Sequence, residues 1–383
     1  MRIVADENIP FLSEAFGPLG DVAALPADRM TPEAVQSADA LIVRSVTPVG
    51  ARLLSGSKVR FVATATIGTD HIDGEYLAAH GIGFASAAGS NARSVAEYVV
   101  AALTVLAERR SSSLAGKVMG IVGVGNVGSR VARMAAAIGM TVLRNDPPLA
   151  RSTGDPAYVP IEALFDADFL TFHVPLTHDG PDATYHMIDE GLLRGLKRGA
   201  TLFNTSRGAV GDTAALRAAI QAGHIGAAVL DVWEGEPNIN LDLVAGAAIA
   251  TPHIAGYSLD GKVNGTRMVL EALCRHFGME RAWDPSPLLD PPRVPRLRIR
   301  AGTPPEEALR QAAGAAYDIR ADDAALRAMA KQPPEKRSRY FVSLRKNYPV
   351  RREFPSTAVE LDAGDAKTAS LLGALGFSVA TPV

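Results

Sequence analysis

The chain has 383 residues, which at roughly 100–200 residues per domain predicts two or three domains. Hydrophobic residues make up 47% of the chain and charged residues 21%, an ordinary globular composition that excludes a disordered or fibrous protein. The formal net charge of −2 argues against a protein built wholly around nucleic acid or an anionic membrane.

The cysteine content and the lengths of the apolar runs indicate in which cellular compartment the protein works. The only cysteine, Cys274, excludes an internal disulfide framework and a cysteine-cluster metal site, and it is typical of a reducing cytoplasm. The N-terminal apolar run meets Asp6 too soon for a signal peptide, and the longest apolar stretch, residues 98–107, is too short for a bilayer. No group of His residues has metal-ligand spacing. We therefore expect a cytoplasmic protein with no metal and no membrane contact.

Short apolar runs alternate with helical pieces over the first 90 residues. Residues 3–5, 41–43 and 61–63 are continuously apolar, which is typical of strands buried on both faces of a parallel sheet. Residues 94–110 then carry apolar side chains at helical spacing.

A second series of strands and helices begins at Lys117. The alternation predicts a doubly wound parallel sheet. We expect its strands at 118–122, 141–144, 169–173, 201–204, 227–231 and 248–250, with helices at 126–138, 161–165, 190–196 and 213–222. Another helix is expected to run from after Gly256 to about Phe277.

The composition changes near residue 284, where a proline-rich connector begins. Beyond it we expect a strand at 297–300, a helix at 305–316 and a basic segment at 331–352, which has eight Lys or Arg and one acid. A basic surface interleaved with aromatic residues is compatible with nucleic-acid binding. A solvated or interface-facing side of a small α+β domain has the same pattern and is commoner, so we favour a protein interface and expect no nucleic acid.

A glycine-rich turn carries the first chemical signal. Residues 123–128 read Gly-Val-Gly-Asn-Val-Gly, preceded by a predicted strand and followed by a predicted helix. Asp146 ends the next strand, close to the spacing at which a dinucleotide fold places its ribose-binding acid. The glycines Gly123, Gly125 and Gly128 let a pyrophosphate approach the helix end, and an acid at 146 favours NAD over NADP. By itself, Asp146 is also compatible with an ordinary turn residue.

Three later segments place chemically suitable side chains just after predicted strands. Because ligands bind at the carboxyl ends of parallel strands, we expect these side chains at one site. Arg207 supplies a planar partner for a substrate carboxylate, His253 a base that titrates near neutrality, and Glu236 a carboxylate that orients the imidazole. Taken singly, Arg207 and Glu236 are equally compatible with surface roles, and His253 with a hydrogen-bonded loop. His173 ends a strand at the same edge and is a candidate to line the cofactor site.

Together these segments resemble the D-isomer-specific 2-hydroxyacid dehydrogenases. The motifs that carry the resemblance are residues 123–128, Asn204-Thr205-Ser206-Arg207-Gly208, residues 231–237 and Thr251-Pro252-His253-Ile254-Ala255-Gly256. Stretches at 3–10, 90–98, 253–262, 317–323 and 344–354 sharpen the resemblance to members that oxidise a phosphorylated hydroxy acid. The match covers nearly the whole chain.

The resemblance implies a two-part dehydrogenase with an added tail. It implies a flavodoxin-like substrate domain over 1–97 that closes with 257–283, a Rossmann NAD domain over 98–256, and a C-terminal homodimerisation domain over 284–383. It also implies cofactor contacts at Asn126, Val127, Asp146, Thr205, Ser206, Arg207, Asp231 and Gly256. Val174 stands near the cofactor where the family often has Thr.

Substrate contacts are implied at Ser45, Thr66 and Tyr257. A phosphate needs positive charge, for which we consider Arg44 and Arg93, and also Lys262. Arg44 is alternatively a surface residue, and Lys262 a partner of a neighbouring acid.

Two other functions stay open at this point. One is a broader D-2-hydroxyacid dehydrogenase or hydroxypyruvate-type reductase, which phosphorylated and unphosphorylated acids would discriminate. The other is a non-enzymatic NAD-sensing regulator on the same scaffold, against which the set of Arg207, Glu236 and His253 argues.

Overall fold

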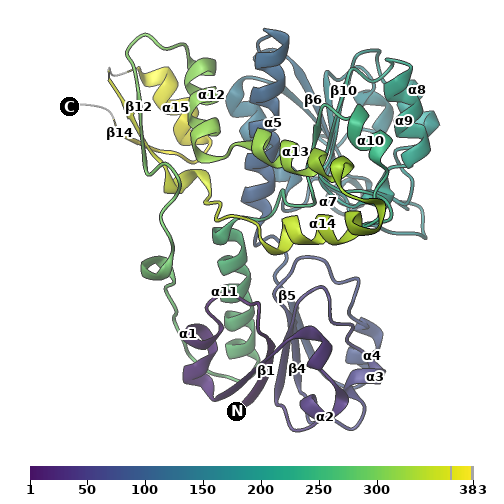
Figure 1. Ribbon diagram of the computed structural model, residues 1–383, viewed down its shortest axis with the longest axis vertical. Coiled ribbons are helices and arrows are strands. Elements are labelled where there is room, and N and C mark those ends of the chain that lie inside the picture. Colours follow the sequence, from purple (N-terminus) through teal and green to yellow (C-terminus); the bar gives the residue numbers. More distant parts are fainter. Residues whose placement is uncertain (363–364, 381–383) are drawn as a thin grey trace. The chain divides into compact units, whose positions relative to one another are not determined.

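The computed structural model describes residues 1–362 and 365–380. The chain forms two compact units (Figure 1). The first consists of Met1–Asn91 and Ser258–Asp290, and the second of Ala92–Tyr257 and Pro291–Val383. The tail beyond Asp290 therefore packs with the second unit. Among the described residues, no helix combines the length and apolar character needed to cross a bilayer.

The first unit is built on a five-stranded parallel sheet. Its strands lie in the order β2-β1-β3-β4-β5, which is the flavodoxin-like order that the sequence predicted. The strands are β1 (Arg2–Asp6), β2 (Asp21–Leu25), β3 (Ala40–Val43), β4 (Phe61–Thr64) and β5 (Gly83–Ser86). Central strands β3 and β4 are buried throughout, and their continuous apolar runs made them recognisable. β2 and β5 lie at the sheet edges and are only partly buried, and they were not predicted from the sequence.

Five helices accompany this sheet: α1 (Leu12–Phe16), α2 (Pro32–Val35), α3 (Ala51–Leu54), α4 (Gly74–Ala79) and α11 (Leu259–His276). The long helix α11 returns from the far side of the sequence. The Ser258 hydroxyl caps it by accepting from the Gly261 N–H. Its buried Val269 and Leu273 join Ile3, Ile42 and Phe61 in one apolar core, so the return segment is an integral part of the first unit.

The second unit is built on a six-stranded parallel sheet in the order β11-β10-β9-β8-β6-β7. Its strands are β6 (Val118–Val122), β7 (Thr141–Asn145), β8 (Phe169–Phe172), β9 (Thr201–Asn204), β10 (Ala227–Leu230) and β11 (Ile249–Ala250). A single parallel bridge from Arg144 to Tyr158 continues the sheet beyond β7. With that bridge counted as a strand, the order is that of the Rossmann fold, and the strand order reverses between β6 and β8. The predicted α/β class is confirmed.

The helices of this sheet are α5 (Ala92–Arg110), α6 (Gly128–Ile138), α7 (Pro147–Thr153), α8 (Glu190–Gly195), α9 (Thr213–Gln221) and α10 (Leu241–Gly246). The helical stretch expected at 161–165 is a 3₁₀ helix, Ile161–Leu164, rather than an α-helix. The helix α7 was not predicted from the sequence, and it begins at Pro147 because proline is tolerated in the first helical turn.

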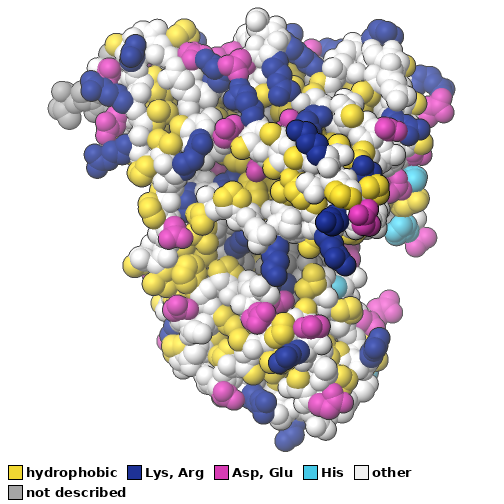
Figure 2. Space-filling model, viewed as in Figure 1, with side chains coloured by type: hydrophobic (Ala, Val, Ile, Leu, Met, Phe, Trp, Pro, Cys, Tyr) yellow, Lys and Arg dark blue, Asp and Glu magenta, His cyan; other side chains and the backbone are white. Residues whose placement is uncertain are grey.

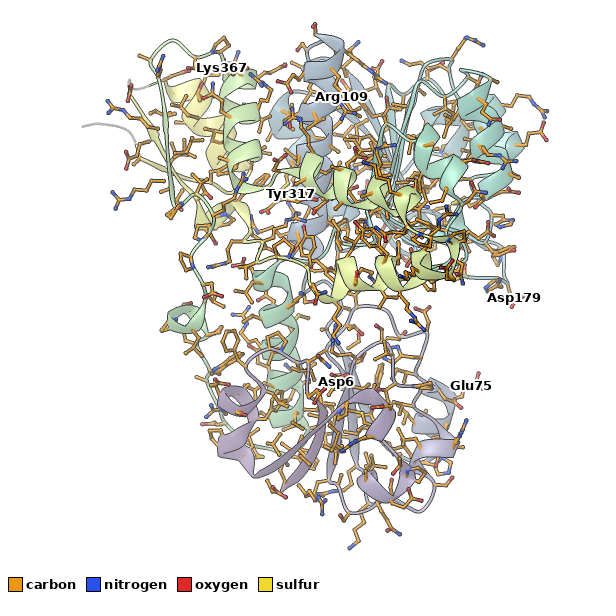
Figure 3. All side chains as sticks on the ribbon, viewed as in Figure 1. Asp6, Glu75, Arg109, Asp179, Tyr317 and Lys367 are labelled. Carbon is orange, nitrogen blue, oxygen red and sulfur yellow. The ribbon has the colours of Figure 1, made fainter. Side chains whose placement is uncertain are left out.

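The tail adds a three-stranded parallel sheet and four helices. The strands are β12 (Arg296–Ile299), β13 (Ala358–Leu361) and β14 (Ser378–Ala380). The helices are α12 (Pro305–Ala316), α13 (Ile319–Arg327), α14 (Pro334–Lys346) and α15 (Ala366–Ala374). Ala308 and Leu309 of α12 share one core with Val99 and Leu103 of α5. Tyr317 lies where α12 gives way to α13 (Figure 3), and α13 continues beside β11.

Candidate active site

The glycine-rich loop after β6 leaves room for a ligand at its second glycine. Gly123 has a φ of 83°, and a Cβ there would lie 2.7 Å from the His173 carbonyl oxygen. A Cβ on Gly128 would lie 2.0 Å from the Gly123 carbonyl oxygen, so α6 begins this close to the loop only with glycine. At Gly125, in contrast, an added Cβ would meet open space. The residues present therefore fit a dinucleotide pyrophosphate.

Asp146 connects this loop to the end of β7. Its Oδ2 accepts a 2.8 Å hydrogen bond from the Val124 N–H, and its Oδ1 accepts from the Leu149 N–H at 3.0 Å. The second bond caps α7. A carboxylate offers about four acceptor sites, so capacity remains for ribose hydroxyls. The acid that the sequence singled out thus lies next to the glycine loop.

Two glycine variants separate loop geometry from ligand space. We expect Gly128→Ala to lower the melting temperature by several degrees, because its Cβ would collide with the Gly123 carbonyl. Gly125→Ala should leave the melting temperature of the ligand-free protein unchanged and weaken NAD binding at least about tenfold, because the methyl group fills the space for the pyrophosphate. Thermal unfolding and NAD titration measure both effects. Unweakened NAD binding in Gly125→Ala would place the pyrophosphate elsewhere.

Arg207 follows β9 on a loop that Asn204 organises. The Asn204 Oδ1 accepts from the Ser206 N–H at 3.1 Å, and its Nδ2 donates to the Arg207 carbonyl at 3.0 Å. Gly208 fits directly against the next loop, because a Cβ there would lie 2.0 Å from the Trp233 carbonyl oxygen. The loop that carries Arg207 is therefore held against the loop that leads to Glu236.

Glu236 and His253 form a hydrogen-bonded pair. The Glu236 Oε2 lies 2.8 Å from the His253 Nδ1, and its Oε1 accepts from the Trp233 N–H at 2.9 Å. Burial opposes the ionised form of Glu236, but the hydrogen bond and charge of His253 outweigh it, and the pKa of this carboxyl is lowered. An ionised Glu236 fixes Nδ1 as the protonated nitrogen and leaves Nε2 to receive a proton.

The loop that carries His253 is held by the buried carboxylate of Asp231. Asp231 is 1% exposed, and it accepts from the Thr251 hydroxyl at 2.6 Å and from the N–H groups of Ile254 and Ala255 at 2.8 and 2.9 Å. The Asp231 carbonyl also accepts from the His253 N–H at 2.7 Å. His253 has a φ of 59°, a left-handed conformation that is unfavourable for a residue with a side chain. These bonds hold that conformation in place.

Tyr98 and Thr251 extend this arrangement into the core. The Tyr98 hydroxyl, on the wholly buried face of α5, lies 2.7 Å from the Thr251 hydroxyl, which donates to Asp231. The Thr251 carbonyl accepts from the Trp233 Nε1 at 2.9 Å. We did not single out Tyr98, Thr251 or Asn204 as functional from the sequence. Thr251 and Asn204 lie within the recognised motifs and Tyr98 within the stretch 90–98, but nothing in that apolar helix assigned a role to the Tyr98 hydroxyl.

We expect Thr251→Val to destabilise the protein by about 1–3 kcal/mol, because the Tyr98 hydroxyl and an Asp231 oxygen would each lose a buried partner. Tyr98→Phe should cost less, since Thr251 can still donate to Asp231. Urea unfolding of both variants measures the difference. Equal losses would mean that the connection to Asp231 adds nothing.

His173 and Val174 follow β8 at the same sheet edge. The His173 Nε2 lies 3.0 Å from the Thr171 hydroxyl, and its Nδ1 lies 3.2 Å from the Thr205 hydroxyl. Burial lowers the pKa of His173 to about 3, so this imidazole is neutral at physiological pH. The Val174 side chain would be 2.8 Å from a Cβ at Gly123, which places it against the glycine loop.

The substrate candidates of the first unit lie after β3 and β4. Arg44 and Ser45 directly follow β3, and Thr66 follows β4 with its hydroxyl 2.7 Å from that of Thr64. Burial lowers the pKa of Lys262, and the charge of Arg44 lowers it further, so the two cations lie within electrostatic reach of each other. Two such cations attract an anion.

Arg93 and Tyr257 lie in the second unit. The Arg93 Nε is 3.8 Å from the Glu353 Oε2, so this cation is already associated with an acid of the tail. The Tyr257 ring packs edge-on against the Tyr348 ring, with 5.8 Å between the ring centres. Both residues that the sequence assigned to substrate in this unit therefore contact the tail.

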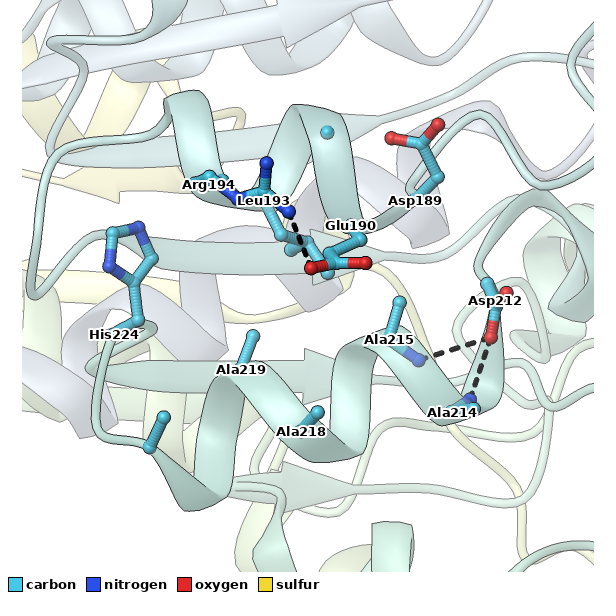
Figure 4. Close-up of a pocket in the computed structure, with 12 residues that line it drawn as sticks. Asp189, Glu190, Leu193, Arg194, Asp212, Ala214, Ala215, Ala218, Ala219 and His224 are labelled. Atoms are coloured by element: carbon cyan, nitrogen blue, oxygen red, sulfur yellow. Dashed lines mark hydrogen bonds and ion pairs between the residues drawn. The ribbon is translucent and has the colours of Figure 1, made fainter.

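A separate hollow lies between α8 and α9 (Figure 4). No predicted site residue lines it. Its polar side chains serve their own helices: Asp189 caps α8, Asp212 caps α9, and Glu190 pairs with Arg194. We assign no function to this hollow.

Comparisons with known proteins agree with this geometry. Residues 88–255 match the NAD-binding domain model of the D-isomer-specific 2-hydroxyacid dehydrogenases, and residues 288–376 match a domain of unknown function. The chain is 49% identical to an erythronate-4-phosphate dehydrogenase of Salinibacter ruber, over 97% of this chain and 98% of that relative. It is 48% identical to that of Edwardsiella ictaluri, over 98% and 99%.

A solved structure shows how much of the chain belongs to the common scaffold. The D-lactate dehydrogenase of Aquifex aeolicus, complexed with NAD and lactic acid, aligns with a TM-score of 0.57 and 26% identity. The alignment spans 96% of the lactate dehydrogenase chain but only 73% of this one.

Proposed function

Since the chain belongs to the erythronate-4-phosphate dehydrogenases of the D-isomer-specific 2-hydroxyacid dehydrogenase family, we propose that it makes (R)-3-hydroxy-2-oxo-4-phosphooxybutanoate. The substrate is 4-phospho-D-erythronate, the hydride acceptor is NAD, and the reaction serves pyridoxal 5′-phosphate (vitamin B6) synthesis. The observation that carries this proposal is the His253–Glu236 pair, on the loops that follow β10 and β11 of the nucleotide-binding sheet.

His253 acts as the base in this reaction. Its Nδ1 is engaged by Glu236, so Nε2 takes the proton from the C2 hydroxyl while the C2–H bond breaks. NAD, when bound, supplies the chemistry of accepting that hydride. Glu236 stays ionised because its pKa is lowered, and it stabilises the imidazolium that forms. Arg207 holds the substrate carboxylate through a planar pair of hydrogen bonds.

The cofactor is held by the second unit. We assign its pyrophosphate to Gly123, Gly125, Asn126, Val127 and Gly128, and its ribose to Asp146. Thr205, Ser206 and Gly256 would also contact the cofactor, Asp231 would face its nicotinamide amide, and Val174 lies against the glycine loop. The Asp231 carboxylate accepts three hydrogen bonds from its own chain, so any contact it makes to the nicotinamide amide uses its remaining acceptor capacity.

The substrate is held by Ser45, Thr66 and Tyr257, with Arg44 and Arg93 for its phosphate. The charge of Arg44, which contributes to the lowered pKa of Lys262, supports an anion contact in the first unit. The tail forms the homodimer contact in this proposal. Val342 and Val350 are 48% and 54% exposed, and apolar exposure in a basic segment favours a protein partner. On the face shown in Figure 2, acidic side chains are interspersed with Lys and Arg.

A steady-state assay tests the function. We expect NADH formation from 4-phospho-D-erythronate and NAD, with a 2-oxo acid present to regenerate oxidised cofactor. Unphosphorylated D-erythronate should react at least about 100-fold less efficiently, because the cations of the protein that bind the phosphate would have no anion to pair with. Equal turnover of both acids would indicate a broad D-2-hydroxyacid dehydrogenase, and no turnover of either would favour a regulator.

Replacement of the base and its partner tests their roles. His253→Asn should lower kcat by about 10²–10⁴-fold while NAD still binds. Glu236→Gln should lower kcat as well, because the carboxylate that orients the imidazole and stabilises the imidazolium is lost. His173→Gln should lose less activity than either variant, since burial lowers the pKa of His173 to about 3 and leaves this imidazole neutral at physiological pH. A greater loss of kcat in His173→Gln than in His253→Asn would contradict these assignments.

A further inference from the structure

The helix α14 of the tail lies against the loop that carries Glu236. Its Phe341 is wholly buried in one core with Leu230 and Trp233, and Tyr340 packs against the same core. The Ser338 hydroxyl donates to the Asn238 side chain, two residues beyond Glu236. The tail therefore reaches the catalytic edge of the nucleotide sheet.

Arg345, near the end of α14, extends its guanidinium toward Tyr257 and Glu236. Its guanidinium carbon lies 5.6 Å from the centre of the Tyr257 ring, and Tyr257 directly follows the His253 loop. The charge of Arg345 also contributes to the lowered pKa of Glu236. Both neighbours belong to the second unit, so these relations hold within one compact body.

Arg345 is half-buried, and within the described residues its guanidinium forms no ion pair with an acid, although its charge is felt at Glu236. Its Nε is shielded from solvent, and within the described part of the chain it has no hydrogen-bond partner. A shielded N–H of a charged group costs free energy unless it is paired. Arginine presents several donors in a planar fork that matches a phosphate. A phosphate, such as the one that the substrate carries at C4, would pair with this guanidinium near Tyr257 and Glu236.

We propose that Arg345 is a specificity-determining residue that binds the substrate phosphate from the tail. This rests on the function proposed above, in which Arg207 already holds the carboxylate. The full-length relatives named for a phosphorylated acid cover 97–98% of this chain, whereas the lactate enzyme covers 73%. The tail thereby supplies a phosphate ligand to a scaffold whose other residues carry out the oxidation.

Paired substrates test the proposal in the full-length protein. For Arg345→Gln we expect kcat/KM for 4-phospho-D-erythronate to fall about 100-fold. Arg345→Lys should lose about tenfold, because it keeps the charge without the planar fork. Unphosphorylated D-erythronate, followed as a substrate or as a competitive inhibitor where turnover is too slow, should change by no more than about twofold. Arg339→Gln is the matched control, since Arg339 is an exposed arginine of the same helix.

Further readouts separate this role from a structural one. NAD affinity and sedimentation should be the same in Arg345→Gln, Arg345→Lys and the wild type. Equal losses for both acids would mean that Arg345 positions Glu236 or Tyr257, and would overturn the phosphate assignment. Unchanged selectivity between the two acids in Arg345→Gln would also overturn the phosphate assignment. In either case, turnover of the phosphorylated acid by the wild-type protein would still support the proposed function. A wild type that oxidises neither acid would instead refute the function itself.

Discussion

The buried carboxylate of Asp231 is the interaction on which the catalytic edge of the second unit depends. Three donors from residues 251–255 converge on it, and its own carbonyl receives the N–H of His253. A carboxylate this deeply buried is stable only when it is hydrogen-bonded, so the loop cannot relax without exposing it. The unfavourable left-handed backbone of His253 is therefore retained, and the imidazole meets Glu236.

The tail is bound to the same edge by a buried network of charged and phenolic groups. Arg351 donates to the carbonyls of Ser94 and Ala255, and its guanidinium lies 3.7 Å from the centre of the Tyr317 ring. Glu97 accepts from the Phe354 N–H, and burial, reinforced by Glu353, raises its pKa well above the usual range. The Ala255 carbonyl belongs to the His253 loop, so a residue of the tail directly supports the loop that bears the base.

The sequence predicted the α/β sheets because buried strands leave local patterns, and the candidate catalytic segments were recognised by motifs of the same local kind. Central strand β3 is continuously apolar and β9 is buried throughout, and the glycine loop, Arg207, Glu236 and His253 each follow a strand of the second sheet. Edge strands β2 and β5 were not predicted, and only part of their surface is buried. Tyr98 and Arg345 lie in stretches that support the resemblance, but the sequence did not predict their contacts, because Thr251 is 153 residues from Tyr98 and Tyr257 lies on a different element from Arg345. Contacts of that kind are set by packing, which a motif does not encode.

The shared core of α5 and α12 bears on how the second unit comes apart. Ala308, Leu309 and Ala312 of the tail lie in the same apolar cluster as Val99 and Leu103, and Arg327 donates to the carbonyls of Val244 and Ala247 beside β11. Release of the tail alone would expose this apolar surface to water and leave these carbonyl groups without their hydrogen-bond donor. We therefore expect the tail and the nucleotide sheet to unfold together rather than as separate domains.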